Sequence, residues 1–381
     1  MPNTDTHINK HTDKQKTKVL HLCKVYLPIK GGVQKVVQIL TTISKQYLHQ
    51  VLTTGEDGSV RKQKMDDATV TRCRSYLQLA SLPVAPSMLL EARKKVQDAQ
   101  IICVHYPFPL ADLALFTKLR LPPIVVFWHS NIVVQKKLKW LAYPFIFVTL
   151  MRANRIVVTS QNMIDNSRLL TLFKSKVDEI PFGLPELSSE DNQETTKSGK
   201  YFLLIGRHVS YKGIDIAIKA MVDSDSKLVI AGDGPLFERH KLLVESLNLK
   251  DKVTFHRHVS DQQITKLIKA SVGLIMPSIM HNEAFGLVQL EAMRQRKPVI
   301  NTWLPSSVPT ISRDQLEGIT VKPEDTQALA QAMDKLYKDD SLAKQLGHNG
   351  YDRFISHYTD TRFKKRIESL FEKILKETSS K

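Results

Sequence analysis

Short apolar runs alternate with amphipathic helical segments in two successive stretches of this 381-residue chain, and a polar segment separates the two stretches. In the first stretch, apolar residues recur every three or four positions over 33–48, which predicts a helix. The runs expected to be strands lie at 19–22, 49–53, 101–104, 124–128 and 155–158. Strands joined by helices at this spacing form a parallel sheet with crossover connections. The first stretch therefore predicts a doubly wound α/β domain.

The alternation restarts after the polar segment 186–200, which is typical of an exposed linker between domains. The strands expected here are 201–205, 227–230, 253–256, 272–276 and 298–300, and the helices are 213–221, 235–247, 261–270 and 285–293. A last amphipathic helix is expected at 358–377. We therefore predict an α/β fold of two doubly wound Rossmann-like domains that face each other across a ligand-binding cleft.

Charge is the second constraint, because 55 Lys and Arg residues against 38 Asp and Glu give a net charge of +17. Residues 1–190 contain 26 basic and 14 acidic residues, so most of the excess lies in the first half. Such a field suits nucleic acid, an anionic membrane surface or polyanionic small molecules, or it only keeps the protein soluble. Nucleic acid is disfavoured, because the chain has no recognisable nucleic-acid-binding motif and no long Lys/Arg run.

Cysteine spacing and hydropathy indicate the compartment. The three cysteines stand alone, with no metal-binding spacing, which favours the reducing cytoplasm and predicts no structural metal. Residues 1–17 are polar and are expected to be a disordered leader rather than a secretion signal. The longest strongly apolar stretch, 140–151, is shorter than the roughly 20 residues that span a bilayer.

A cationic loop follows the first strand of the second domain. Gly206 ends the strand, and Arg207 and Lys212 stand five residues apart before the next helix. Two cations and backbone N–H groups at a helix start can hold a diphosphate, although an ordinary charged surface loop has the same composition. The Gly232–Gly234 segment, after the next strand, is a strand-to-helix turn.

Two acidic residues follow the strand expected at 272–276. Glu283 lies in the loop, and Glu291 lies two helical turns beyond it. An ionised carboxylate can accept hydrogen bonds from two vicinal hydroxyls, so sugar and ribose are natural ligands. Gly286 lets the backbone approach a ligand closely. The alternatives are an acid that complements the helix dipole for Glu283 and a solvated helix face for Glu291.

Taken together, these motifs resemble the retaining family-4 glycosyltransferases of the GT-B fold, over about residues 18–375. The motifs are Gly31-Gly32, Gly206-Arg207-x₄-Lys212-Gly213, Gly232-x-Gly234-Pro235 and Glu283-x₇-Glu291. Three further motifs resemble the bacterial surface-polysaccharide members that transfer mannose and related sugars. They are His105-Tyr106-Pro107, Trp128-His129-Ser130 and Thr302-x-Leu304-Pro305-Ser306-x-Val308-Pro309.

The resemblance implies a role for each motif residue. Arg207 and Lys212 would neutralise the leaving nucleoside diphosphate, Glu291 would hold the ribose, and Glu283 would approach the donor sugar. His129 would meet the reacting sugar from the first domain, with His105 as the other candidate histidine. Donor-binding residues would further include Gly31, Gly32, Gly206, Gly232, Gly234, Ala284, Phe285, Gly286 and Leu287. His105 and Ser130 would lie on the acceptor side.

The implied reaction moves a hexose, with retention of configuration, from GDP-mannose or a UDP-sugar to a lipid-linked or saccharide acceptor. Because Arg207 and Lys212 supply the positive charge, neither a metal nor another cofactor is expected. Residues 18–185 would form the acceptor-side domain, 201–357 the nucleotide-sugar domain, and 358–377 a helix packing back on the first domain. The enzyme would work at the inner face of the cytoplasmic membrane in O-antigen, capsule or exopolysaccharide synthesis.

Other interpretations remain at this point. Nucleotide-sugar 2-epimerases share the fold, and a non-catalytic nucleotide-sugar-binding protein would have the same architecture. The segment 136–147, with three lysines and large apolar residues, suits either a membrane interface or buried helix packing. Two positions depart from the family pattern: Gln34 replaces an acid, and the segment 294–297 replaces small residues, which puts the end of the preceding helix in doubt.

Overall fold

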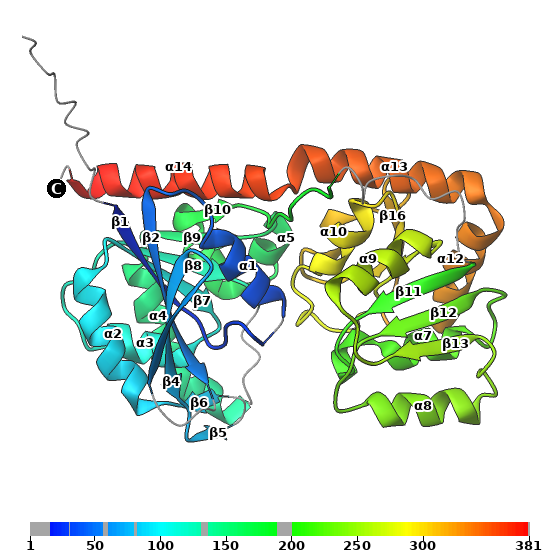
Figure 1. Ribbon diagram of the computed structural model, residues 1–381, viewed down its shortest axis with the longest axis horizontal. Helices are drawn as coiled ribbons and strands as arrows, with labels where there is room; N and C mark the ends of the chain where they lie inside the picture. The colour runs from blue at the N-terminus through cyan, green and yellow to red at the C-terminus, as the bar shows by residue number, and fades with distance from the viewer. Residues whose placement is uncertain are drawn as a thin grey trace, which may run out of the picture.

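The computed structural model describes residues 16–29, 31–55, 60–79, 82–130, 136–188 and 200–379. Two α/β domains lie side by side, and each has a sheet with helices on both faces (Figure 1). The expected leader (1–17) and linker (186–200) lie largely outside the described residues. The predicted fold class, two Rossmann-like domains with parallel sheets, is confirmed.

The N-terminal sheet has the strand order β10-β9-β8-β7-β1-β2-β4-β3. Its pairs are parallel, except that β3 runs antiparallel to β4. The strands are β1 (Thr17–Leu22), β2 (Tyr47–Gly55), β3 (Arg61–Met65), β4 (Ala68–Arg74), β7 (Ile101–Tyr106), β8 (Ile124–Trp128), β9 (Arg155–Val158) and β10 (Val177–Glu179), with a separate hairpin of β5 (Leu77–Leu79) and β6 (Leu82–Val84). The helices are α1 (Gly32–Leu40), α2 (Pro86–Asp98), α3 (Pro109–Phe116), α4 (Lys136–Arg152), α5 (Gln161–Asp165) and α6 (Arg168–Leu172), with a 3₁₀ turn at Lys174–Lys176.

The helix expected at 33–48 is shorter than the sequence predicts. It ends at Leu40, and Tyr47 already begins β2. The hydroxyls of Thr41 and Thr42 donate hydrogen bonds to the carbonyls of Gln38 and Ile39 at 2.8 and 2.9 Å, and so compete with continuation of the helix. The later apolar residues that continued the helical period belong to the following loop and strand.

The C-terminal sheet has the order β13-β12-β11-β14-β15-β16, and all its pairs are parallel. Its strands are β11 (Tyr201–Ile205), β12 (Lys227–Ala231), β13 (Val253–His256), β14 (Gly273–Ile275), β15 (Val299–Thr302) and β16 (Gly318–Val321). Its helices are α7 (Ile214–Ala220), α8 (Phe237–Ser246), α9 (Asp261–Ala270), α10 (Leu287–Met293), α11 (Val308–Ile311), α12 (Thr326–Lys338) and α13 (Asp340–His357), with a 3₁₀ turn at Ser210–Lys212. A crossover helix between neighbouring strands explains the parallel pairing.

Each sheet reverses its winding direction between two central strands. In the N-terminal sheet the reversal lies between β1 and β7, and in the C-terminal sheet it lies between β11 and β14. Ligands of doubly wound sheets bind beyond the carboxyl ends of the strands at this point. Gly31, Arg207 and Glu283 lie in the loops that follow β1, β11 and β14, and His105 lies near the end of β7.

The last helix, α14 (Asp360–Ser379), crosses back over the N-terminal domain (Figure 1). Gln46 donates a hydrogen bond to Glu368 at 2.7 Å, and the Tyr47 ring meets Phe371 edge-on. The apolar face of α14 lies in the same hydrophobic cluster as β1 and β8. Helix α14 therefore forms a connection between the two domains in addition to the linker.

The described helices include none that is both long and apolar enough to cross a membrane. The three cysteines are buried free thiols.

Candidate active site between the two domains

An ion pair joins the loops that follow β11 and β14, the two central strands of the second domain's sheet. Lys212 Nζ is 2.5 Å from Glu283 Oε2, and their side chains are only 14 % and 9 % exposed. The Ser278 hydroxyl donates a further hydrogen bond to the same carboxylate oxygen at 3.3 Å. The two candidate residues, 71 positions apart in the sequence, are thus in direct contact.

Close packing of two loops brings these side chains together. Gly213 has φ +64°, and a Cβ at this position would lie 2.0 Å from the Pro277 carbonyl oxygen. The backbone N–H of Ile279 donates to the Tyr211 carbonyl at 2.9 Å. Only glycine allows the left-handed turn at so close an approach. The loop after β11 is therefore held directly against the loop after β14.

The ion pair keeps Lys212 charged. Burial works against the ammonium, but the Glu283 carboxylate more than compensates, so the pKa of Lys212 is raised above its usual value. Arg207, in contrast, is exposed, and its side chain forms no hydrogen bond or ion pair with the described residues. The loop thus offers one buried cation in a fixed place and one exposed cation that is free to bind an anion.

The candidate glycines have different structural roles. A Cβ at Gly232 would lie 2.1 Å from the Gly206 carbonyl oxygen, so this glycine lets two strand-end loops touch. Gly286 has φ +74° and precedes α10, which begins at Leu287 rather than at 285. Ala284 and Phe285 are buried.

Residues of the opposite domain approach the second half of the Glu-x₇-Glu motif. Burial raises the pKa of Glu291, while the positive charges of Arg294 and, from the N-terminal domain, Lys35 act in the opposite direction. A Cβ at Gly32 would lie 3.7 Å from Leu287 Cδ1. Gly32, at the start of α1, therefore lies against the start of α10.

The first domain contributes a histidine at this boundary. His129 directly follows β8, and its ring packs against Phe182, which in turn meets Phe285 of the second domain edge-on at 5.1 Å. Ser130, beside it, is partly exposed.

The expected acceptor-side position of His105 is wrong. Its ring is buried within the sheet, where Nδ1 is hydrogen-bonded to His129 and Nε2 to His21. Both ring nitrogens are occupied, so His105 cannot contact an acceptor directly. Sequence reasoning also missed His21 and His49 as site residues, because each lies in a segment predicted only as a strand.

Polar contacts hold the domains in register next to the site. The Ser307 hydroxyl is 2.7 Å from that of Thr159 and 2.8 Å from that of Ser160. Asn162 donates to the carbonyls of Leu304 and Ser306. The motif at 302–309 thus forms the second domain's side of this contact.

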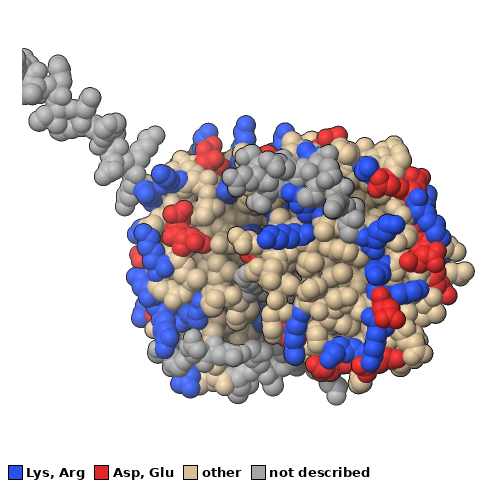
Figure 2. Space-filling view, turned by 45° about the vertical axis from the view of Figure 1, so that its right-hand side comes forward, with Lys and Arg blue, Asp and Glu red and all other residues tan. Residues whose placement is uncertain are grey.

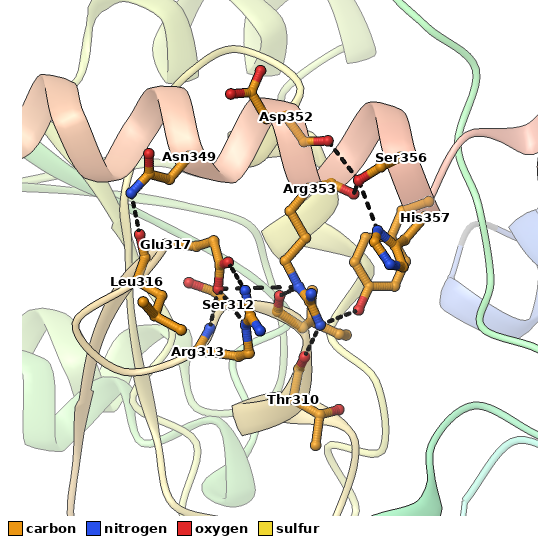
Figure 3. A network of polar contacts seen from close by, with 12 residues as sticks. Thr310, Ser312, Arg313, Leu316, Glu317, Asn349, Asp352, Arg353, Ser356 and His357 are labelled. Atoms are coloured by element: carbon orange, nitrogen blue, oxygen red, sulfur yellow. Dashed lines mark hydrogen bonds and ion pairs between the residues drawn. The ribbon is translucent and has the colours of Figure 1, made fainter.

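Arg353 of α13 supports that segment from behind (Figure 3). Its guanidinium donates to the carbonyls of Thr310 and Ile311, both at 2.9 Å, and lies 4.0 Å from the buried carboxylate of Glu317. Arg313 forms an ion pair with the same carboxylate. This network fixes α11, which directly follows Ser307.

The departure at 294–297 does not disturb the preceding helix. α10 ends at Met293, and Arg296 adopts the left-handed conformation with φ +57°. Its guanidinium stacks on the Tyr351 ring at 3.9 Å, and Arg294 donates to the Pro185 carbonyl at 3.1 Å. The other departure, Gln34, folds back over Gly31.

Within the described ranges, no three His, Cys, Asp or Glu side chains come together in a way that could hold a metal ion.

Comparison with known proteins gives consistent matches along the chain. Residues 30–185 match the family "Glycosyltransferase Family 4", and residues 188–353 match "Glycosyl transferases group 1". An O-antigen chain mannosyltransferase of Escherichia coli is 29 % identical over 90 % of this chain and 94 % of its own length. A D-rhamnosyltransferase of Pseudomonas aeruginosa is 29 % identical over 90 % and 92 %.

Solved structures share the arrangement at lower identity. Sucrose-phosphate synthase from Thermosynechococcus elongatus has a TM-score of 0.74 at 18 % identity, covering 94 % of this chain and 99 % of its own. Anabaena HepE, solved with UDP and glucose, has a TM-score of 0.75 at 16 % identity, covering 93 % and 99 %. These structures support the fold alone.

Proposed function

Because this chain consists of the two domains of a family-4 glycosyltransferase with the GT-B fold, we propose that it transfers a hexose in bacterial surface-polysaccharide synthesis. The donor is a nucleotide sugar, GDP-mannose or a UDP-sugar, and the acceptor is a lipid-linked or growing saccharide. The names of the mannosyl- and rhamnosyltransferase relatives favour mannose or a related sugar.

The contact between Lys212 and Glu283 carries this proposal. The buried ammonium of Lys212 and the exposed Arg207 provide two cations for a diphosphate. The Glu283 carboxylate provides one hydrogen-bond acceptor for a sugar. We assign the ribose hydroxyls to Glu291, which Lys35 of the opposite domain approaches. Gly31 and Gly32 approach the diphosphate from the opposite domain, and His129 approaches the sugar.

The reaction breaks the bond between the anomeric carbon and the phosphate oxygen, and the phosphate keeps the electron pair. Lys212 and Arg207 stabilise the negative charge that develops on the leaving diphosphate. The acceptor hydroxyl attacks from the same face, and its proton passes to the departing phosphate. The new glycosidic bond keeps the donor's configuration, and a nucleoside diphosphate is released.

A panel of nucleotide sugars, with and without acceptor, tests the proposal. We expect nucleoside diphosphate release and a glycosylated product only when the acceptor is present. Conversion of the nucleotide sugar to its 2-epimer without acceptor would establish the epimerase alternative instead. Tight binding of the donor with neither product would leave the non-catalytic interpretation.

We expect transfer to survive excess EDTA, because two side-chain cations supply the positive charge that a divalent ion supplies elsewhere. The assay compares the rate of nucleoside diphosphate release before and after chelation. Complete loss of activity that magnesium restores would contradict the assignment of this charge to Arg207 and Lys212.

The N-terminal domain also has a surface suited to an anionic membrane. Exposed apolar side chains gather where α3, α4 and α6 meet. This apolar patch consists of Phe116, Leu119, Phe147, Met151 and Leu172, which are 51, 99, 43, 53 and 70 % exposed. Phe116 packs on Phe145 of α4, and Phe147 packs on Phe173, so the patch is continuous across these elements.

Basic residues border the apolar patch. Residues 109–176 contain ten basic and two acidic residues. Arg152 donates to the carbonyls of Leu115, Lys118 and Leu119, and Lys176 to that of Met151, so basic residues border the patch directly. In Figure 2, Lys and Arg predominate along the left-hand edge, over the N-terminal domain, whereas both charges alternate on the right. The sequence placed the membrane contact at 136–147; the side chains of 136–142 lie outside the described residues, whereas Phe147 belongs to the apolar patch.

We expect the protein to bind liposomes that contain anionic lipid, and to release them at high salt, because each nearby cation contributes about 1 kcal/mol at an anionic surface. The variant Leu119→Asp/Leu172→Asp should sediment with liposomes at least several-fold less. Leu242→Asp, at a 64 % exposed leucine of α8, is the matched control and should bind normally. Liposome binding that does not depend on lipid charge, on salt or on the double substitution would contradict a membrane role for this patch.

A further inference from the structure

Four histidines form one hydrogen-bonded row across the N-terminal sheet. His49 of β2, His21 of β1, His105 of β7 and His129 after β8 come from four neighbouring strands. The distances are 3.0 Å from His49 Nδ1 to His21 Nε2, 3.1 Å from His21 Nδ1 to His105 Nε2, and 2.8 Å from His105 Nδ1 to His129 Nε2. Each side chain is at most 6 % exposed. We call these four residues the histidine row.

The rings of the histidine row are neutral at pH 7. Burial lowers the pKa of His49 to about 4 and that of His129 to about 3, and it lowers the pKa values of His21 and His105 well below the ordinary range. A neutral imidazole has one N–H and one lone pair. Each of the three contacts needs one donor and one acceptor, so the row has only two arrangements, and one ring's tautomer determines the others.

The buried end of the row selects between these arrangements. His49 Nε2 is buried and has no hydrogen-bond partner within the described chain. An unpaired N–H in the interior is rarer than an under-satisfied acceptor, so Nε2 is the bare nitrogen and the proton lies on Nδ1. His49 therefore donates to His21, His21 to His105, and His105 to His129. All four rings then carry the proton on Nδ1.

We propose that His49, His21 and His105 are positioning residues that fix the tautomer of His129, so that its Nδ1–H is presented as a hydrogen-bond donor at the boundary between the domains. The His129 ring lies there beside Phe182, which contacts Phe285 in the second domain's segment between β14 and α10. The ligand of this N–H is an oxygen of the reacting sugar or of the departing phosphate. This last assignment rests on the proposed function, whereas the tautomer does not.

The wild-type protein tests the tautomer directly. With ¹⁵N-labelled histidine, long-range ¹H–¹⁵N spectra at pH 7 distinguish protonated from bare ring nitrogens. We expect four buried neutral rings that are all protonated on Nδ1, assigned by single His→Gln variants. Protonation of Nε2 on any of the four rings, or a charged ring at pH 7, would overturn the proposal. The result is decisive even if the protein catalyses a different reaction.

A matched pair at the far end of the histidine row tests its effect on transfer. His49→Gln retains an amide N–H that can donate to His21, and it should preserve the His129 tautomer and near wild-type activity. His49→Glu, of the same size, accepts instead and should move the His129 proton to Nε2, with a loss of about 10-fold or more in kcat/KM. Equal activity of the two variants despite opposite His129 tautomers would refute the role of the His129 tautomer in sugar transfer. If His49→Glu does not fold, the wild-type spectrum still decides the tautomer.

Discussion

Replacement of Lys212 by alanine is expected to lower kcat/KM for the nucleotide sugar by about 10²-fold or more, which is typical for the loss of one preorganised donor to a developing anion. The ammonium is held 2.5 Å from Glu283 and is largely buried, so it is fixed in position before charge develops on the leaving group. Lys219→Ala, at an exposed lysine of the following helix, is the control and should keep wild-type kinetics. The measurement is steady-state release of the nucleoside diphosphate.

Arg207→Ala separates catalysis from stability. Its side chain is exposed and has no partner within the described residues, so we expect unchanged thermal stability together with a comparable loss of kcat/KM. Lys212→Ala, in contrast, should also destabilise the protein, because the buried Glu283 loses its counter-charge. Wild-type turnover by both variants would mean that this loop is only a charged surface.

Mild acid is expected to destabilise the protein strongly. The native pKa values of the histidine row lie below the unfolded value of about 6.5, so the unfolded chain binds more protons as the pH falls from 6.5 towards 4. The free energy of unfolding is therefore fully retained above pH 6.5 and decreases as the pH drops below 6.5. Each such histidine contributes up to about 1.4 kcal/mol per pH unit, so four remove on the order of 5 kcal/mol by pH 5.5.

Urea unfolding at pH 7.5 and 5.5, followed by circular dichroism, measures this loss. The Asp67 carboxylate acts in the opposite direction on His49, but burial outweighs it. His49→Gln should reduce the pH dependence by about one proton relative to the wild type. A free energy of unfolding that is the same at both pH values would show that the histidine row is already protonated or solvated.

The strand pattern could be predicted because buried parallel strands are continuous apolar runs. Ile124–Trp128 and Tyr201–Ile205 begin and end where the sequence predicted them. The β3 strand, Arg61–Met65, could not be found this way, because it is exposed at the sheet edge and its sequence is mostly charged. The end of α1 depended on local hydroxyl contacts that a helical period does not reveal.

The site was less accessible to sequence reasoning than the fold. The resemblance named Arg207, Lys212, Glu283 and Glu291 as candidates, but the direct contact of Lys212 with Glu283 depends on the close packing of two loops at Gly213. The histidine row depends on strand order, because β2, β1, β7 and β8 are neighbours in space but not all in sequence. For the same reason, sequence alone treated His105 as a residue facing the acceptor.

The anomeric configuration of the product tests the central claim most directly. A donor labelled with ¹³C at the anomeric carbon and α-linked to its nucleotide is incubated with enzyme and acceptor, and the one-bond ¹H–¹³C coupling of the product is measured. Same-face attack, with Arg207 and Lys212 holding the leaving diphosphate, predicts an α-linked product. A β-linked product, or release of the nucleotide sugar as its 2-epimer, would contradict this account.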